Sequence, residues 1–498
     1  MASHHQPQSP ESRFHELFVR AVTHSERDPQ EQAACHLANE KARWFYVRRD
    51  KSTLNLAKTF LAVRSTFVTL TDPEMSGNRQ TRRQFPTLVS FVGPTTAGKS
   101  SLVRAIQSLG DLRSVHIPPM SHTDSHAQFI GSNFATLLKR LDTSVCHGPV
   151  TQSAHVDDSV RSTTYGVHLY KDSHPNTTAT NRPDIAQIDS SVFFADAEGF
   201  GADEGSTTAE IRGPSTFDNS EVQEFPIIPE EYVGKGKAGI DHFYWRLLYT
   251  LTDVIVFVTE KDQGLLKDLV YLLESAARAR LESVNASPKT LIIVRNRANQ
   301  HHKEFYDPWK LHTKYMDRDT KVWEGPGASE TLARFVEKYN HERGSWADEI
   351  DTNEKLYRAL FYEVRCCYIP HLSNMQGHES EMFRQYEQLR DMIEEVASGS
   401  VELRLRRGML LNVPQQIHLQ GLAFKHLTIY TTPFDYSAAA KGDNADPTSP
   451  SSHMANFLRH AIQSPFRVPG LTGTSSFVSD MFILAALLEE RRIGDGIS

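Results

Sequence analysis

The chain of 498 residues is long enough to bury a large core, and its length predicts two or three domains. Its net charge of −7, with 23% charged residues, excludes the strongly basic surface of a general nucleic-acid-binding protein. The four cysteines lack the spacing of metal ligands and indicate buried thiols in a reducing compartment.

Apolar segments are short throughout the chain. The N-terminal residues carry no apolar signal segment, and the longest apolar run near the C-terminus, 481–488, is far below the ~20 residues that span a bilayer. We therefore expect a cytoplasmic protein without a transmembrane segment, for which peripheral membrane contact stays open.

The first 84 residues precede the most regular pattern of the chain. Residues 1–28 are rich in His, Gln, Ser and Pro and are predicted to be disordered. Residues 29–84 are predicted to form a helical segment, because four residues recur in them at roughly helical spacing: Leu54, Ala57, Leu61 and Arg64.

The most specific pattern is G-x-x-x-x-G-K-S, which spans residues 93–100. An apolar stretch at 87–92 predicts a strand before it, and apolar residues at helical spacing over 102–109 predict a helix after it. A strand that turns sharply into a helix directs backbone N–H groups and the positive end of the helix dipole at one spot. The pattern therefore predicts a phosphate-binding loop, with a chance match as the alternative.

The loop residues predict contacts to a nucleoside triphosphate and to Mg²⁺. Lys99 would reach the terminal phosphates, and the hydroxyl of Ser100 would bind the metal. The other loop residues predicted to contact the nucleotide are Gly93, Thr95, Thr96, Ala97, Gly98 and Ser101.

A second motif, Asp196-Ala197-Glu198-Gly199, follows an apolar strand signal at 191–195. An Asp at the carboxyl end of a buried strand can hold Mg²⁺, usually through a water molecule. The backbone N–H of Gly199 could reach the γ-phosphate at a place where a side chain would obstruct. The alternative is an Asx turn that ends a strand.

A third segment lies between these two and contains Arg161 and Thr164. The hydroxyl of Thr164 could complete the Mg²⁺ shell, while its backbone N–H contacts the γ-phosphate. Loss of that phosphate would release the loop, as in nucleotide switches. The alternative is a solvated loop before a strand.

The rest of the chain alternates strand and helix signals. Strands are predicted at 253–259, 290–294 and 364–369, and helices at 265–281 and 378–396. This alternation after a phosphate loop predicts an open, mostly parallel α/β sheet with its ligand at the carboxyl ends of the strands.

Domain boundaries follow from changes in composition. The nucleotide domain is placed at 85–372, a helical region at 373–440, and a linker with a weakly helical tail at 441–498. The Gly-, Ser- and acid-rich stretch 201–237 is predicted to be an extended switch segment or an insertion that meets a protein partner, with a surface loop as the alternative. A basic cluster at 404–407 predicts the C-terminal end of a helix, where it would complement the dipole.

The order of these motifs resembles the G domain of dynamin-like large GTPases, in the guanylate-binding protein and atlastin branch. The resemblance covers about residues 85–372. It rests on the phosphate loop and on three further segments: Thr164-Tyr165-Gly166-Val167, Asp196-Ala197-Glu198-Gly199 and Cys367-Tyr368-Ile369-Pro370-His371. It implies Mg²⁺-dependent binding and hydrolysis of GTP to GDP, and dimerisation through the G domain.

The chain departs from that family in its charges. Thr96 stands where the family carries an arginine that neutralises transition-state charge, and such an arginine is worth about 10³–10⁵ in rate. Arg161 is a candidate substitute, and an arginine from a second subunit is equally open; a solvated loop arginine is the alternative. Glu198 is a candidate for orienting the switch segment.

The base-recognition motif also departs from the family. One alignment places Asn296, after Arg295, where the family has Asp; another reads 296–299 as a variant of N-K-x-D. In both, no carboxylate faces the base, and an amide oxygen cannot pair two donors as a carboxylate does. The preference for guanine is therefore implied by the resemblance alone.

Two other functions stay open at this stage. One is an ATPase or small-molecule kinase with the same loop, although the sequence lacks an Arg-rich lid. The other is a pseudo-GTPase that binds nucleotide or a partner with little turnover, which Thr96 and Asn296 favour.

Overall fold

The structure is a computed structural model, and every residue that it describes lies in the first of two units, 1–436 and 437–498. The predicted disordered N-terminus at 1–28 and the predicted linker and tail at 441–498 lie outside the described residues. The described ranges are 37–50, 58–71, 84–95, 97–114, 166–172, 191–200, 222–260, 265–281, 283–284, 289–298, 307–316, 321–324, 329–343, 349–370, 379–406, 409–432 and 434–435.

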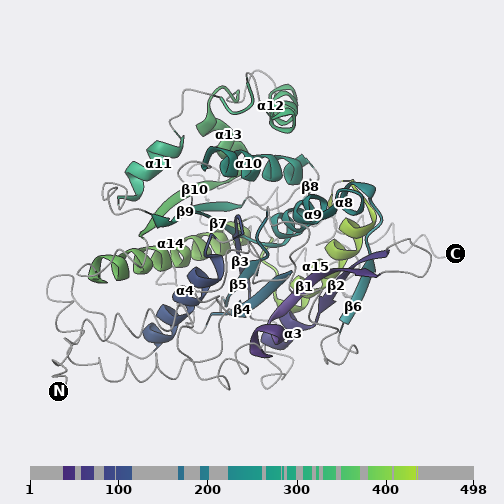
Figure 1. Ribbon diagram of the computed structural model, residues 1–498, viewed down its shortest axis with the longest axis horizontal. Coiled ribbons are helices and arrows are strands. Elements are labelled where there is room, and N and C mark those ends of the chain that lie inside the picture. The colour runs from purple at the N-terminus through teal and green to yellow at the C-terminus, as the bar shows by residue number, and fades with distance from the viewer. Residues whose placement is uncertain are drawn as a thin grey trace, which may run out of the picture. The chain divides into compact units, whose positions relative to one another are not determined.

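A nine-stranded sheet in the order β10-β9-β7-β3-β5-β4-β1-β2-β6 runs through the described unit (Figure 1). The strands from β10 to β5 are parallel to one another and form what we call the parallel half. Its apolar strands confirm the predicted α/β class. Their bounds are β3 (Thr87–Val92), β5 (Val192–Ala197), β7 (Val254–Thr259), β9 (Thr290–Ala298) and β10 (Glu363–Pro370).

The order of the parallel strands reverses next to β3. The chain first adds β5 on one side of β3 and then adds β7, β9 and β10 on the other. In chain order the five strands thus lie as 2-1-3-4-5, a doubly wound arrangement. Ligands of such sheets bind beyond the carboxyl ends of the strands where the order reverses, which here is between β3 and β7.

Four further strands continue the sheet beyond β5, and we call them the antiparallel extension. β4 is antiparallel to β5, β1 pairs with β4 and β2, and β2 pairs with β6, all antiparallel. Their bounds are β1 (Arg43–Asp50), β2 (Lys58–Arg64), β4 (Val167–Lys171) and β6 (Val222–Pro226).

The extension corrects two predictions. The helical segment predicted for 29–84 is wrong over β1 and β2, because pairing between strands overrides a weak helical spacing. Leu61 and Ala62 are adjacent in sequence yet both fully buried, so β2 is covered on both of its faces. The stretch 201–237 is not a continuous loop, because its later part forms β6 and the helix α8 (Glu230–Val233).

Helices cover both faces of the parallel half (Figure 1). On one face, apolar side chains of α4 and α14 join those of β3, β5, β7, β9 and β10 in a single core. The bounds of the longer helices are α4 (Lys99–Ser114), α9 (Gly236–Leu251), α10 (Leu265–Leu281), α12 (Glu330–Arg343), α14 (Glu379–Arg406) and α15 (Val413–Ile429). The shorter elements are α3 (Thr66–Leu70), α11 (Pro308–Met316), α13 (Asn353–Leu360), β8 (Ser283–Val284) and β11 (Phe434–Asp435).

The described part of the predicted helical region at 373–440, residues 379–435 with short gaps, belongs to the same compact unit as the sheet. The helix predicted at 378–396 is confirmed as α14, which extends ten residues further to Arg406. Arg404, from the basic cluster, is buried and donates to the backbone oxygen of Pro86 at 3.1 Å and to Thr87 Oγ1 at 3.0 Å. Arg404 and Arg406 of this cluster lie in the last turn of α14, as predicted, and Arg404 in addition ties this helix to the start of β3. None of the helices in the described part of the chain is both long and apolar enough to cross a membrane.

Candidate nucleotide-binding site

The loop that joins β3 to α4 has the backbone shape that its glycines predict. Gly93 and Gly98 have φ values of 152° and 81°, a region that other residues rarely adopt. A Cβ atom on Gly93 would lie 2.0 Å from the backbone oxygen of Val258 in β7, so the loop passes directly against the neighbouring strand. The strand, loop and helix occur in the predicted order, and the loop lies at the reversal of strand order. Thr96 is outside the described residues.

The D-A-E-G turn, whose first two residues end β5, packs against this loop. The Thr95 N–H donates to the backbone oxygen of Phe200 at 3.0 Å, and the Phe200 N–H donates to Gly93 O at 3.3 Å. A Cβ on Gly199 would come within 2.6 Å of Thr95 N, which leaves no room for a larger residue. The two motifs, about a hundred residues apart in sequence, therefore form one continuous wall.

Lys99, the first residue of α4, folds back onto the loop. Its Nζ donates to the backbone oxygens of Gly93 at 3.1 Å and Pro94 at 2.9 Å. Burial lowers the pKa of Lys99 to about 8, although the nearby carboxylates of Asp196 and Glu198 oppose that shift. The amine is thus held in place by neutral carbonyl groups, which a phosphate could replace as a stronger acceptor.

Ser100 and Asp196 meet although they are far apart in sequence. Ser100 Oγ donates to Asp196 Oδ2 at 2.6 Å, and both side chains are buried. A hydroxyl and a carboxylate are the hard oxygen ligands that Mg²⁺ prefers, and Mg²⁺ sites commonly pair one or two carboxylates with substrate phosphates. Within the described ranges there is no group of three or more His, Cys, Asp or Glu side chains that could hold a metal. A magnesium ion bound here would therefore depend on ligand oxygens as well.

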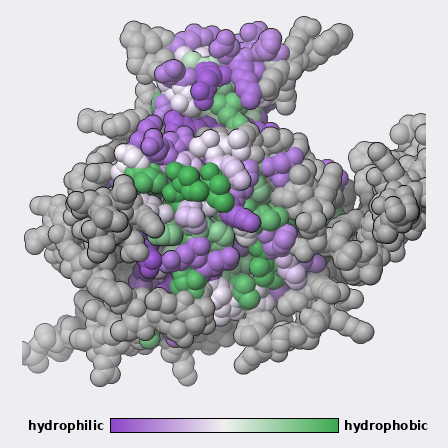
Figure 2. All heavy atoms as spheres, turned by 90° about the vertical axis from the view of Figure 1, so that its right-hand side faces the viewer, coloured by the Kyte–Doolittle hydropathy of each residue, from purple (hydrophilic) through white to green (hydrophobic). Residues whose placement is uncertain are grey.

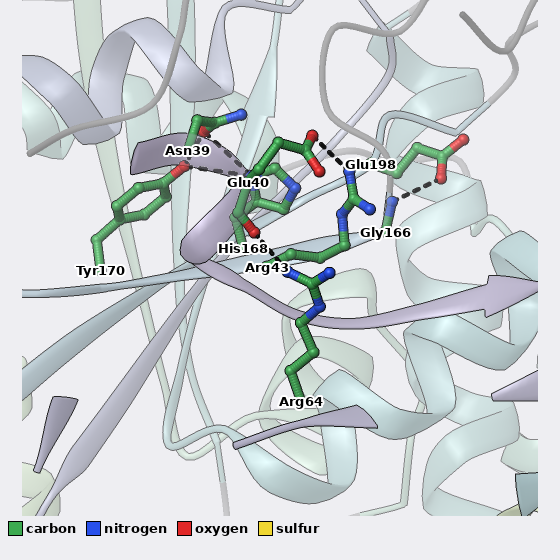
Figure 3. A network of polar contacts seen from close by, with 8 residues as sticks. All are labelled: Asn39, Glu40, Arg43, Arg64, Gly166, His168, Tyr170 and Glu198. Carbon is green, nitrogen blue, oxygen red and sulfur yellow. Dashed lines mark hydrogen bonds and ion pairs between the residues drawn. The ribbon is translucent and has the colours of Figure 1, made fainter. Parts of the chain in front are cut away.

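Glu198 connects the D-A-E-G turn to the start of β4. Its Oε2 accepts from the Gly166 N–H at 3.1 Å, and its own N–H donates to Gly166 O at 2.8 Å, as Figure 3 shows for the side-chain contact. Its Oε1 pairs with Lys237 Nζ at 2.6 Å. Arg161 and Thr164 lie outside the described residues, so their roles stay predictions.

A buried polar network braces β4 from the other side (Figure 3). Asn39 Oδ1 lies 3.1 Å from His168 Nδ1 and accepts a hydrogen bond from the Tyr170 hydroxyl. Burial, with a contribution from the charge of Asp196, raises the pKa of Tyr170 well above its usual value. His168 also lies directly opposite Asp196 in the antiparallel pair of β4 and β5.

The same network continues from β4 to β1 and β2 through charged residues. Arg43 pairs with the side chain of Glu40 at 2.6 Å, and Arg64 donates to the backbone oxygen of Glu40 at 2.9 Å. Sequence reasoning missed Asn39, Glu40 and Arg43. The partners of Asn39 lie on β4, more than a hundred residues further along the chain, and the partners of Glu40 lie on the strands β1 and β2, which were predicted as helix. A β-branched and aromatic pattern over 43–47 was the available signal for a strand in this place.

Asn296 lies behind the phosphate loop at the end of β9. Its Nδ2 donates to the backbone oxygen of Ala97 at 2.8 Å, and both Asn296 and Arg295 are buried. The amide nitrogen therefore supports the loop, and the side-chain oxygen is the group left for other contacts. Asn299 lies outside the described residues.

The structure thus brings together described members of the predicted site from the loop and from two strand ends: Gly93, Thr95, Ala97, Gly98, Lys99, Ser100, Asp196, Glu198, Gly199 and Asn296. Arg295 is buried beside Asn296. Ser101, also predicted, lies half-buried in the first turn of α4. No model of a known protein family matches this chain, and no curated protein matches its sequence.

Proposed function

We propose that this protein is a Mg²⁺-dependent switch protein that binds and hydrolyses GTP, with a G domain similar to that of the dynamin-like large GTPases. The observation that carries the proposal is the contact between two distant motifs at the strand reversal. There the Ser100 hydroxyl binds the Asp196 carboxylate, and Gly199 packs on Thr95. A phosphate loop, a metal-binding pair and a glycine turn are the parts that phosphoryl transfer requires.

The chain's own residues would share the work as follows. Backbone N–H groups at the start of α4 and the amine of Lys99 would bind the β- and γ-phosphates, with Lys99 exchanging the carbonyls of Gly93 and Pro94 for phosphate oxygens. Ser100, Asp196 and Thr164 would hold Mg²⁺, which when bound neutralises phosphate charge.

Hydrolysis itself needs a positioned water molecule. Water adds to the γ-phosphorus as the bond to the bridging oxygen breaks, which yields GDP and phosphate. The Gly199 N–H would donate to the γ-phosphate, and Glu198 would fix the turn that carries it. The transition-state cation would be Arg161 or an arginine from a second copy in a G-domain dimer.

A second candidate function is a pseudo-GTPase module that binds nucleotide without turnover. The contact that favours it is the one between Asn296 and Ala97, because that amide supports the loop and offers no carboxylate to a guanine ring. Thr96 in place of the family's arginine points the same way. An ATPase or kinase is the third candidate, and the relative affinities for GTP and ATP separate it from the other two.

Calorimetric titration of the purified full chain with Mg²⁺ and GTP, GDP or ATP tests the proposal. We expect GTP to bind more tightly than ATP. Lys99→Ala should weaken GTP binding by about a hundredfold, since it removes a charged hydrogen bond to phosphate. Lys355→Ala, which changes a half-exposed lysine paired with Asp351, is the matched control and should bind as wild type.

The outcomes separate the candidates. Retention of neither nucleotide overturns the proposal, and tighter binding of ATP favours the ATPase or kinase. Single-turnover phosphate release then decides between the first two functions. A protein that holds GTP for many hours without releasing phosphate is the pseudo-GTPase module.

A further inference from the structure

Lys237 lies outside every motif of the sequence, yet its side chain enters the candidate site. It occupies the first turn of α9, and its side chain is only 11% exposed. Its Nζ lies 2.6 Å from Glu198 Oε1 and 2.8 Å from Asp241 Oδ1. The end of the stretch 201–237 therefore contacts the D-A-E-G turn directly.

The local backbone is built to direct Lys237 inward. Gly236, just before it, has a φ of 59°, in the left-handed region that favours glycine. A Cβ on Gly239 would lie 2.3 Å from the backbone oxygen of Tyr232 in α8, so α8 packs tightly against α9. The left-handed backbone at Gly236 and the close approach at Gly239 set the direction in which the first turn of α9 leaves α8.

The ion pair matters because Glu198 is buried. Its side chain is only 3% exposed, and a carboxylate taken out of water requires compensating partners. Lys237 compensates Oε1, and the Gly166 N–H compensates Oε2. Without the lysine, Glu198 must either take up a proton or turn toward water, and turning would break its contact with Gly166.

Lys237 also stays charged in this environment. Burial alone would lower the pKa of Lys237, but the charges of Glu198 and Asp241 outweigh that effect and raise it above its usual value. The amine is therefore a permanent cation at neutral pH and faces the buried side chain of Glu198.

We propose that Lys237 is a positioning residue that holds Glu198 against Gly166 and so couples the D-A-E-G turn and the start of β4 to helix α9. The functional consequence of this coupling rests on the GTPase function proposed above. A change in the phosphate bound at the D-A-E-G turn would move Glu198. The ion pair with Lys237 would pass this movement on to α9. The coupling itself is a property of the folded chain and can be tested without nucleotide.

Hydrogen exchange of the full-length protein tests the coupling. Lys237→Met should accelerate exchange of the Gly166 amide by about tenfold or more, because a hydrogen bond to a charged group is lost. Lys237→Arg should restore protection, since it keeps the cation. Asp241→Asn is the matched control, because it changes the other partner of Lys237 and leaves the pair with Glu198; exchange at Gly166 should stay within about twofold of wild type.

Two exchange results would overturn the coupling. One is Lys237→Met with unchanged exchange at Gly166. The other is an equal acceleration in Lys237→Met across β3 and β9, which would show general loss of stability. Neither result depends on whether the protein binds GTP.

A kinetic measurement tests the consequence. In Lys237→Met, single-turnover hydrolysis should slow by about tenfold, because one interaction is lost in the transition state. The affinity for Mg²⁺ and GTP should stay within about threefold, because the ion pairs of Lys237 are formed with Glu198 and Asp241, neither of which belongs to the phosphate loop. Equal losses of rate and affinity would assign Lys237 a purely structural role. If wild type binds no GTP, the proposed function fails, while the exchange result still decides the coupling.

Discussion

The parallel half and the antiparallel extension bury their strands by different rules. Strands β3, β5 and β7 are largely apolar and buried along their whole length, and β5 and β7 carry their polar residues, Asp196 and Thr259, near their carboxyl ends. Strand β6 at the far edge of the extension is largely exposed. Figure 2, which views the molecule from the right-hand side of Figure 1, shows hydrophobic groups among hydrophilic ones.

The two regions also divide the work of the candidate site. The parallel half supplies the phosphate loop, Asp196 and Asn296, which are the groups with ligand chemistry. The extension is braced at β4, where His168 contacts Asn39 from the helical residues just before β1. The groups with ligand chemistry thus lie where strand order reverses, while the added strands hold in place the segment that follows the Thr164 motif.

The largest effect is expected where α14 crosses from the parallel half to β4. Arg390 forms a buried two-pronged pair with Asp172, the residue after β4, at 2.5 and 3.1 Å. Arg390→Met should lower the free energy of unfolding by about 3–5 kcal/mol, because it removes one charge of a buried ion pair. Urea denaturation measures this loss.

Arg358→Ala is the control for that measurement. Its guanidinium is 75% exposed and pairs with Glu354 on the surface of α13, so its loss should change stability by less than about 0.5 kcal/mol. A loss below about 1 kcal/mol in Arg390→Met would show that Asp172 finds another partner, and that the two regions are less firmly joined than the contacts indicate.

Gly199→Ala tests the packing of the D-A-E-G turn against the phosphate loop. The new methyl group would meet Thr95 N within 2.6 Å, so the hydrogen bonds between Thr95, Phe200 and Gly93 must part. We expect a loss of roughly 2 kcal/mol in stability, together with weaker GTP binding. Thermal unfolding and nucleotide titration measure both.

A second glycine serves as the matched control. Gly399 lies inside α14 with nothing within 4 Å of the position that a Cβ atom would take, so Gly399→Ala should stabilise the protein by about 0.5–1 kcal/mol. If both substitutions change stability in the same direction, close packing against Thr95 is not what requires a glycine at position 199.

The pH dependence of nucleotide binding reports on Lys99. Its pKa in the folded protein is about 8, below the value of 10.5 for a free lysine side chain. Above pH 8 the free protein loses this charge, so GTP affinity should fall by about tenfold between pH 7 and pH 9. Between the two pKa values the unfolded chain binds more protons, so stability should rise with pH over that window.

Lys99→Arg separates this effect from other titrations. Arginine stays charged over the whole range, so the GTP affinity of the variant should be flat between pH 7 and pH 9. An equal fall of affinity in both proteins would assign the pH dependence to a different group.

The smallest effect is expected at the exposed edge of the extension. Arg48 on β1 and Glu224 on β6 form a pair at 3.2 Å, and their side chains are 41% and 35% exposed. Glu224→Ala should change the free energy of unfolding by less than about 0.5 kcal/mol. A larger loss in urea denaturation would show that the edge of the extension is held together by charge.

The sequence by itself determined the strands of the parallel half and the loop between β3 and α4. The apolar pattern predicts Thr87–Val92 with its observed bounds, and the helical spacing does the same for Leu265–Leu281. Strands buried on both faces favour apolar residues, and sharp turns favour glycine, so both leave local signals that need no knowledge of the partner.

Tertiary structure alone decided the extension and the contacts of the site. The sequence near Leu61 fits a helix or a covered strand, and pairing with β1 and β6 selects the strand. Ser100 meets Asp196, and Lys237 meets Glu198, across gaps in sequence that no local pattern spans. Such contacts depend on where the folded sheet brings the chain back, because a buried charge signals the need for a partner but not its identity.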